Sequence, residues 1–274
     1  MPKVSVISTV FNGEPYFDRA VDSILGQQYD DFEWVLLDDG STDRTAEMLG
    51  DLAARDSRVR LLTPGRLGRA KALNQATEDA RGEYIANHDF DDISYPSRLA
   101  LQADFLDRHP EVGVLGGHYL LVDERRAERY ERRPPESHEQ IAHAMASRIP
   151  LAHTVVMFRK QAWRDAGGYP DVSDLEDYRL FIKMGVLGWR FASLPVMLGE
   201  HFVYEQSYWH RTFDYRTRQR SMARAQTMAI EALGLPFWTR IYPLGRQFYW
   251  LLPTGMKRAA RRLIGGSSEM DQPS

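Results

Sequence analysis

Residues 84–92 read Tyr-Ile-Ala-Asn-His-Asp-Phe-Asp-Asp, an apolar run that leads directly into three closely spaced carboxylates. The apolar part, Tyr84 to Ala86, predicts a short buried strand. Carboxylates this close repel one another, so a folded protein keeps them where a cation offsets their charge or where water solvates them fully. In an α/β protein the end of such a strand is where ligands bind. The acidic run, residues 88–92, therefore predicts a ligand site.

Strand and helix patterns alternate on both sides of the acidic run. Strands are predicted, in chain order, over residues 4–9, 32–37, 59–62, 84–86 and 112–115, and helices over 15–25, 41–52, 68–80 and 95–106. Repeated strand–helix units with short connections imply a mostly parallel sheet with helices on both faces. The predicted fold class is therefore α/β and Rossmann-like.

The regular alternation fades after Gly116. Later elements are predicted as a polar hairpin over 119–133, a core strand over 153–158 and a helix over 176–187, and the chain becomes helical and basic from about Arg211. The last ten residues are rich in Gly and Ser, which favours disorder. We expect a main domain over 1–210 with halves at 1–116 and 117–210, a helical C-terminal extension over 211–264 and a disordered tail over 265–274.

Composition excludes several classes of protein. The net charge of −3 argues against general nucleic-acid binding. The absence of cysteine excludes disulfides, thiolate metal sites and cysteine nucleophiles. The amino terminus shows no secretory signal, and no segment approaches the roughly 18 apolar residues of a membrane-spanning helix. We expect a cytoplasmic protein.

The ends of the first two predicted strands carry weaker signals. Neither a Gly-x-Gly-x-x-Gly turn nor a Gly-x-x-x-x-Gly-Lys loop follows the first strand, which lowers the prospect of a dinucleotide dehydrogenase or a P-loop enzyme. The second strand ends in Asp38-Asp39. A carboxylate there could accept hydrogen bonds from a ribose hydroxyl or a base N–H, and a solvated turn with Asp43 capping the next helix explains the pattern equally well.

The spacing of Asp89 and Asp91 is more telling, because residues two apart in an extended segment point the same way. Two such carboxylates can share a hard divalent cation that also binds a diphosphate. Glu176 and Asp177 open a predicted helix, where they either stabilise its N-terminus or supply a general base. We expect His153 to be a structural hydrogen-bonding residue.

Two cations on the third predicted helix, Arg69 and Lys71, could meet phosphate charge. We expect both to be solvated surface residues.

Taken together, the motifs resemble those of the family 2 glycosyltransferases, inverting enzymes with the GT-A fold. The resemblance covers about residues 3–205 and rests on motifs in the family's order: residues 4–7 with Phe11-Asn12, residues 38–43, Asn74 with residues 82–85, the Asp89-Phe90-Asp91-Asp92 segment, and Gly167-Gly168-Tyr169 with Glu176-Asp177. It implies an α/β fold of the GT-A type and transfer of a sugar from a nucleoside-diphosphate sugar.

The resemblance also implies roles for individual residues. Thr9 and Asp39 would line the nucleotide pocket, with Asp39 reaching the base. Asp89 would meet the ribose and the metal shell, and Asp91 would bind Mn²⁺ or Mg²⁺ beside the diphosphate. Asp177 would be the general base.

Two neighbours of these residues receive no ligand role. Asp92 is expected to cap the helix entered at Pro96. Phe90 stands where the family often has a small residue.

The implied function is metal-dependent inverting sugar transfer, with a UDP-sugar as the favoured donor and a glycan or lipid-linked acceptor, in bacterial cell-surface or exopolysaccharide synthesis. A catalytically inactive protein that binds sugar nucleotides or glycans stays open, as does a sugar nucleotidyltransferase. A processive synthase is disfavoured, because the sequence has neither membrane-spanning segments nor a Gln-x-x-Arg-Trp motif.

Residues 236–262 mix aromatic side chains with cations. Such a segment suits a helix that lies in a membrane interface. A helix that packs its aromatic residues on the main domain is an equally good interpretation. A peripheral contact at the inner face of the membrane therefore stays open.

Overall fold

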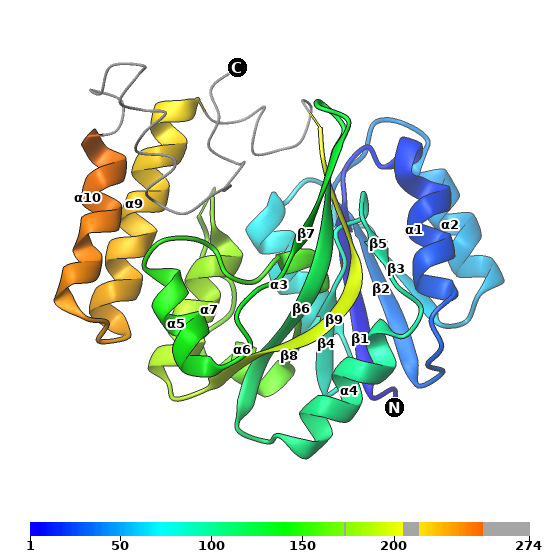
Figure 1. The fold of residues 1–274 in the computed structure, drawn as a ribbon. Helices are drawn as coiled ribbons and strands as arrows, with labels where there is room; N and C mark the ends of the chain where they lie inside the picture. The colour runs from blue at the N-terminus through cyan, green and yellow to red at the C-terminus, as the bar shows by residue number, and fades with distance from the viewer. Residues whose placement is uncertain (173, 205–213, 249–274) are drawn as a thin grey trace.

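The structure is a computed structural model that describes residues 1–172, 174–204 and 214–248 of the 274-residue chain (Figure 1). Its centre is a nine-stranded sheet in the order β3-β2-β1-β4-β8-β6-β9-β5, with β7 paired to β6. The strands are β1 (Val4–Val10), β2 (Phe32–Asp38), β3 (Val59–Leu62), β4 (Tyr84–Asn87), β5 (Ile93–Ser94), β6 (Val112–Asp123), β7 (Glu128–Arg132), β8 (Met157–Arg159) and β9 (Arg190–Val203).

The predicted α/β class is confirmed, and the parallel pairing is concentrated in one part of the sheet. Strands β3, β2, β1 and β4 pair in parallel, as the strand–helix alternation predicts. Beyond β4 the sheet is mixed, because β8 runs antiparallel to both β4 and β6 while β6 and β9 are parallel. The parallel part therefore brings the ends of β1, β2 and β4 to one edge of the sheet.

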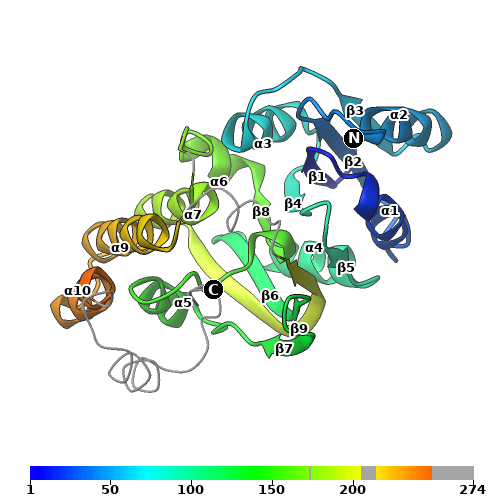
Figure 2. The ribbon, with the colours of Figure 1, turned by 90° about the horizontal axis from the view of Figure 1, so that it is seen from above.

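Helices cover both faces of the sheet (Figures 1 and 2). They are α1 (Phe17–Leu25), α2 (Thr45–Arg55), α3 (Arg69–Asp79), α4 (Arg98–Arg108), α5 (His138–Met145), α6 (Lys160–Asp165), α7 (Glu176–Val186), α9 (Tyr215–Ala232) and α10 (Ile241–Phe248), with short 3₁₀ turns η1 (Glu14–Tyr16), η2 (His153–Val155) and η3 (Phe237–Arg240).

Alternation along β2 divides the core into two layers. Trp34 and Leu36 pack with side chains of α1, α2 and α4, whereas Val35 and Leu37 pack with those of α3 and α7. Successive side chains of a strand point to opposite faces, so a strand with helices on both sides needs apolar residues at every position. All seven residues of β2 are buried, and they are apolar except for Glu33 and Asp38.

Several elements differ from the sequence prediction. The predicted strand over 153–158 is a helical turn, η2, followed by a three-residue strand, β8. The hairpin predicted over 119–133 is confirmed as the β6–β7 pair, in which Tyr119 lies opposite Arg132. The 14-residue strand β9 was not predicted. The boundary proposed between residues 116 and 117 falls inside β6, and the division into two halves stays a prediction.

The C-terminal extension is helical over α9, η3 and α10. The disordered tail predicted over residues 265–274 lies outside the described residues, as does the whole stretch after Phe248. Within the described ranges no helix is long and apolar enough to cross a membrane.

Candidate functional site

The carboxyl ends of β1, β2 and β4 form the edge at which the predicted nucleotide-binding residues lie. Thr9 is half-buried near the end of β1, opposite Leu37 of β2. His88 follows β4 and donates its backbone N–H to the Ile7 carbonyl at 3.0 Å, which continues the parallel pairing into the acidic run. The sheet thus brings Thr9, Asp39 and Asp89 to one edge.

Asp39 is buried where β2 ends, and the loop before α3 holds its carboxylate. Its Oδ1 accepts hydrogen bonds from the Leu67 N–H at 2.6 Å and the Gly68 N–H at 3.1 Å. Its Oδ2 pairs with the Arg66 guanidinium at 2.9 Å. Arg66 also lies over the ring of Phe11, 3.8 Å from the ring centroid. The end of β2 is thereby joined to a cation and a partly exposed aromatic ring.

Arg69 connects the acidic run to the start of α7. One guanidinium nitrogen contacts Asp89 Oδ1 at 3.2 Å, and Nε contacts Glu176 Oε1 at 2.5 Å. The same guanidinium lies 3.4 Å from Nδ1 of His153, whose Nε2 is 2.9 Å from the Tyr169 hydroxyl. The prediction that Arg69 is a solvated surface residue is wrong, because two carboxylates from distant segments converge on it. Arg69 joins the two acidic motifs in one site.

The prediction for the neighbouring cation is confirmed. Lys71 is exposed, and its ion-pair partner among the described residues is the exposed Asp171, at 3.4 Å.

The pKa values of the two predicted acids shift in opposite directions. Burial alone would raise the pKa of Asp89, but the charge of Arg69 holds it well below its ordinary value. Burial raises the pKa of Asp177; His153 opposes this rise, and the adjacent Glu176 carboxylate adds to it. Asp89 is thus held as an anion, whereas Asp177 binds a proton more readily than an ordinary aspartate.

The backbone before Asp177 is strained. Leu175, the residue before α7, is buried and has a φ of 54°, in the left-handed region that bulky side chains avoid. Such strain persists only where the surrounding structure imposes it, and it clusters at functional sites. Asp177 itself is half-buried in the first turn of the helix.

Asp91 lies in a second group of contacts. Its Oδ2 accepts a hydrogen bond from the Tyr204 hydroxyl, and its backbone carbonyl accepts one from Arg19. The Tyr204 ring stacks on Tyr16, with 5.4 Å between the ring centroids. Burial, together with the charges of Asp92 and Asp89, raises the pKa of Asp91 to about 6.

Asp92 does not cap the following helix, which corrects the sequence prediction. Its carboxylate is fully buried and accepts hydrogen bonds from the Phe202 N–H at 2.8 Å and from His201 Nδ1 at 2.9 Å. Helix α4 begins after Ser97 with no side-chain cap. Asp92 therefore ties the acidic run to β9. This contact could not be predicted from the sequence, because β9 lies about a hundred residues further along the chain.

The acidic run fits a divalent cation. Its oxygen donors suit Mg²⁺ or Mn²⁺, and the pKa of Asp91 is raised by burial and by the neighbouring charges of Asp92 and Asp89, which a bound cation would offset. Among the residues that the structure describes, no group of three or more His, Asp or Glu side chains is arranged to hold a metal. Mg²⁺ sites in nucleotide enzymes commonly use one or two carboxylates and complete the shell with phosphate oxygens and water.

Several site residues were not selected from the sequence as functional, namely Arg69, His153, Tyr169, His201 and Tyr204. His153 and Arg69 were weighed and assigned other roles. No local pattern distinguishes Tyr204 or His201, because their partners belong to the acidic run far earlier in the chain.

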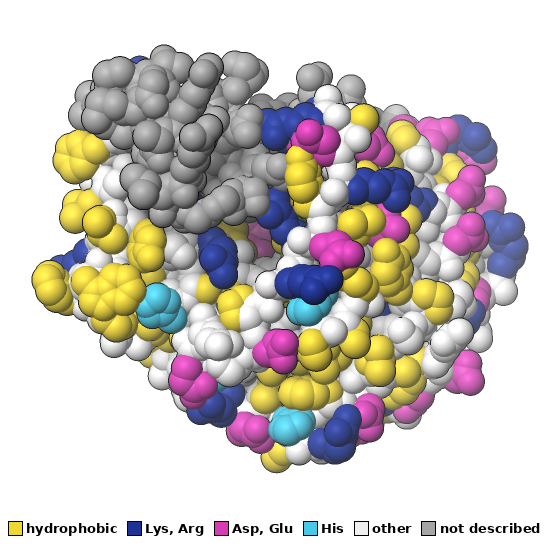
Figure 3. Space-filling model, in the orientation of Figure 1, with side chains coloured by type: hydrophobic (Ala, Val, Ile, Leu, Met, Phe, Trp, Pro, Cys, Tyr) yellow, Lys and Arg dark blue, Asp and Glu magenta, His cyan; other side chains and the backbone are white. Residues whose placement is uncertain are grey.

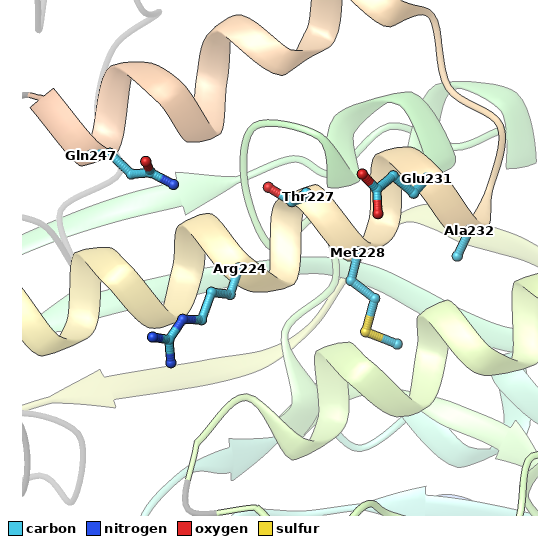
Figure 4. A pocket seen from close by; sticks show the side chains of 6 residues that line it. All are labelled: Arg224, Thr227, Met228, Glu231, Ala232 and Gln247. Carbon is cyan, nitrogen blue, oxygen red and sulfur yellow. The ribbon is translucent and has the colours of Figure 1, made fainter.

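A groove of about 640 Å³ lies between α9 and α10, lined by Arg224, Thr227, Met228, Glu231, Ala232 and Gln247 (Figure 4). None of the predicted site residues lines it. Its two charged residues, Arg224 and Glu231, both come from α9, so it does not gather the converging polar groups that mark a catalytic site.

The comparisons with known proteins identify the family of the chain. The model of the family described as "Glycosyl transferase family 2" matches residues 5–165. The chain belongs to this family, and the protein is a glycosyltransferase. The matched range holds the strand ends, the acidic run and His153, whereas Asp177 lies beyond it.

Two relatives illustrate the range of the family. EpsE of Bacillus subtilis, which is named as a glycosyltransferase, is 34% identical over 257 residues that cover 90% of each chain. The amylovoran biosynthesis glycosyltransferase AmsE of Erwinia amylovora is 32% identical over 200 residues, which cover 71% of this chain and 74% of AmsE.

Solved structures confirm the GT-A-type fold. The mannosyltransferase PcManGT of Pyrobaculum calidifontis, solved with GDP-Man and Mn²⁺, matches with a TM-score of 0.69 at 23% identity, over 98% of this chain and 77% of its own. Residues 1–349 of S. aureus TarS with UDP-GlcNAc match with a TM-score of 0.66 at 20% identity, over 97% of this chain and 77% of theirs.

Proposed function

We propose that this glycosyltransferase is metal-dependent and inverting, and that it moves a sugar from a nucleoside-diphosphate sugar to an acceptor hydroxyl. The observation that carries the proposal is the Arg69 bridge, 3.2 Å from Asp89 and 2.5 Å from Glu176. The bridge links the strand-end carboxylates, suited to a donor, with the acidic pair at the start of α7, suited to a base.

On the donor side, we assign Thr9 and Asp39 to the nucleotide pocket and Asp89 to the ribose and the metal shell. Asp91 would hold the Mn²⁺ or Mg²⁺. When bound, such a cation neutralises charge that develops on a diphosphate leaving group. The buried position of Asp39, between the backbone of residues 67–68 and Arg66, supports a fixed acceptor of hydrogen bonds at the base end of the pocket.

On the acceptor side, Asp177 acts as the general base. Its carboxylate takes the proton of the acceptor hydroxyl while the hydroxyl oxygen bonds to C1 of the sugar. The bond from C1 to the diphosphate breaks on the opposite face, and the configuration inverts. Positioned proton transfer contributes about 10²–10⁴-fold to rate. The raised pKa of Asp177 supports this role, because a base works best when its pKa approaches the working pH.

We further propose a UDP-sugar as the donor and a glycan or lipid-linked acceptor in the synthesis of a bacterial surface or exported polysaccharide. The relatives support the polysaccharide assignment, since one is named for amylovoran and another, WbnJ of Escherichia coli, for O-antigen biosynthesis. The donor assignment rests on the resemblance, and a screen of UDP-, GDP- and dTDP-sugars tests it.

The proposal is tested with Asp177→Asn, which removes the base and keeps the side chain's size. Transfer measured as nucleotide release with an acceptor should fall by at least about 10²-fold. Binding of the sugar nucleotide, measured by calorimetry, should be unchanged. Asp171→Asn is the matched control, because this exposed carboxylate lies in the segment before α7 and, in the part of the chain that the structure describes, pairs with the exposed Lys71 and with none of the candidate site residues.

Turnover retained in Asp177→Asn would remove Asp177 from the base role. A wild-type protein that binds a sugar nucleotide but neither transfers nor hydrolyses it would favour an inactive binding protein. Pyrophosphate release from a nucleoside triphosphate and a sugar phosphate would instead indicate a nucleotidyltransferase.

A further inference from the structure

The three carboxylates of the acidic run differ in the groups that hold them. Asp89 pairs with a guanidinium at 3.2 Å, and Asp92 pairs with an imidazole at 2.9 Å. On the face shown in Figure 3, several Asp and Glu side chains likewise lie beside Lys or Arg side chains. Among the residues that the structure describes, no cationic side chain forms an ion pair with the Asp91 carboxylate, which accepts a hydrogen bond from the Tyr204 hydroxyl. Asp91 therefore has a neutral donor where its two neighbours have ionisable bases.

A hydroxyl donor fixes the direction of a carboxylate without neutralising its charge. The hydrogen bond from Tyr204 holds Oδ2 of Asp91, whereas Oδ1 accepts no hydrogen bond in the described part of the chain. Asp91 is half-buried, and Oδ1 is not one of the buried polar atoms that lack a partner, so it reaches solvent. The negative charge and one oxygen of Asp91 thus stay available to a hard divalent cation, which prefers oxygen ligands.

The Tyr204 ring is itself held by residues from the opposite end of the chain. It stacks on Tyr16 of η1, with 5.4 Å between the ring centroids and 14° between the ring planes. The guanidinium of Arg19 in α1 lies 5.5 Å from the Tyr16 centroid and 3.8 Å from that of Phe202 in β9. Arg19 also donates a hydrogen bond to the backbone carbonyl of Asp91. One cluster between α1 and the end of β9 therefore fixes both the backbone and the carboxylate of Asp91.

We propose that Tyr204 is a positioning residue for the divalent cation: its hydroxyl orients the Asp91 carboxylate, and the Tyr16 ring holds Tyr204 in place. The inference rests on the proposed function, because it takes Asp91 as the metal ligand. Hydrogen-bonding partners of a metal ligand set its direction, and their loss typically weakens metal binding by about 10–100-fold. Tyr204 acts through Asp91 and is assigned no contact with the substrate.

The test is Tyr204→Phe, which keeps the stacked ring and removes the hydroxyl. Mn²⁺ binding in the presence of UDP, measured by electron paramagnetic resonance of the free ion, should be about 10–100-fold weaker than in the wild type. The Mn²⁺ concentration that half-activates transfer should rise by a similar factor, whereas the transfer rate at saturating Mn²⁺ should approach that of the wild type. A general loss of structure would lower the maximal rate as well.

Tyr95→Phe is the matched control, because the Tyr95 hydroxyl also donates to a carboxylate, Glu200 Oε1 at 3.1 Å, but not to the acidic run. It should bind Mn²⁺ like the wild type. A second variant, Tyr16→Leu, keeps the Tyr204 hydroxyl and removes the ring on which Tyr204 stacks. Its Mn²⁺ binding should weaken in the same direction as that of Tyr204→Phe. Circular dichroism checks that each variant is folded.

Equal Mn²⁺ affinity in the wild type and Tyr204→Phe would overturn the inference and leave the proposed function standing. Tighter binding by Tyr204→Phe would also overturn it, because the hydroxyl would then compete with the cation for Asp91. An unchanged affinity in Tyr16→Leu would remove the stack from the proposed role. A wild type that binds no Mn²⁺ with UDP or GDP would overturn both the inference and the proposed metal dependence.

Discussion

Arg69 has a different environment in the folded protein from the one that its local sequence predicts. Beside the exposed Lys71 near the start of α3, it has the local pattern of a solvated cation. In the structure the carboxylates of Asp89 and Glu176 both meet it, and they hold its pKa well above the ordinary value although burial alone would lower it. Its role could not be predicted, because both partners lie far from it in sequence.

His201 provides a test at the same scale. Burial alone would lower its pKa, but Asp92, with help from Asp89 and Asp91, raises it from 6.5 to about 9. The folded state therefore favours protonated His201, and this contribution to stability is complete below pH 6.5 and is lost as the pH rises through 9.

The variant His201→Asn keeps an N–H donor for Asp92 and removes the charge. Without divalent cations, the melting temperature of the wild type should exceed that of His201→Asn below pH 6.5, and the difference should shrink towards pH 9. Thermal unfolding followed by circular dichroism across this window measures it. A difference that does not change with pH would show that the raised pKa contributes nothing to stability.

At the scale of elements, α3 is tied to the turn after α6. Asn74 of α3 donates to the Tyr169 carbonyl and accepts from the Tyr169 N–H, both at 2.8 Å. The Tyr169 hydroxyl in turn contacts His153 at 2.9 Å. The Gly167-Gly168 turn that leads into Tyr169 therefore positions a side chain of the candidate site.

Substitutions in this turn separate backbone strain from a steric clash. Gly167 and Gly168 have φ values of 73° and 77°, so alanine at either position should cost about 1–2 kcal/mol. Only at Gly168 would the added Cβ meet a neighbour, at 2.7 Å from Asn74 Oδ1. Gly168→Ala should therefore lower the free energy of unfolding in urea more than Gly167→Ala, and should also reduce transfer. Equal losses would mean that the contact with α3 is unimportant.

Strand β9 shows why one element was missed. Pro195 and Gly199 interrupt its sequence, and both residues usually argue against a strand interior. The structure accommodates the interruption with register shifts against β6 around Gly117 and His118. The same strand places Phe202 and His201 against Asp92. Because β9 was not predicted, the contact of His201 with Asp92 could not be predicted either.

At the scale of the whole molecule, ligand binding should stabilise the fold. A ligand that binds only the folded state, at a hundred times its dissociation constant, adds about 2.7 kcal/mol. Mn²⁺ with UDP should therefore raise the melting temperature of the wild type, and UDP should do so more than GDP or dTDP. Asp91→Ala should lose the Mn²⁺-dependent part of this increase. An unchanged increase in Asp91→Ala would argue against Asp91 as the metal ligand.

The sequence by itself determined the strand–helix order from β1 to β4, the parallel part of the sheet and the carboxylates at the strand ends, because hydrophobic periodicity and short motifs are local properties of the chain. The tertiary structure alone decided which charges meet. The Arg69–Glu176 pair and the bond from Phe202 to Asp92 each join residues more than a hundred positions apart. These contacts depend on how the mixed part of the sheet is arranged against the parallel part. A local sequence pattern does not predict that arrangement.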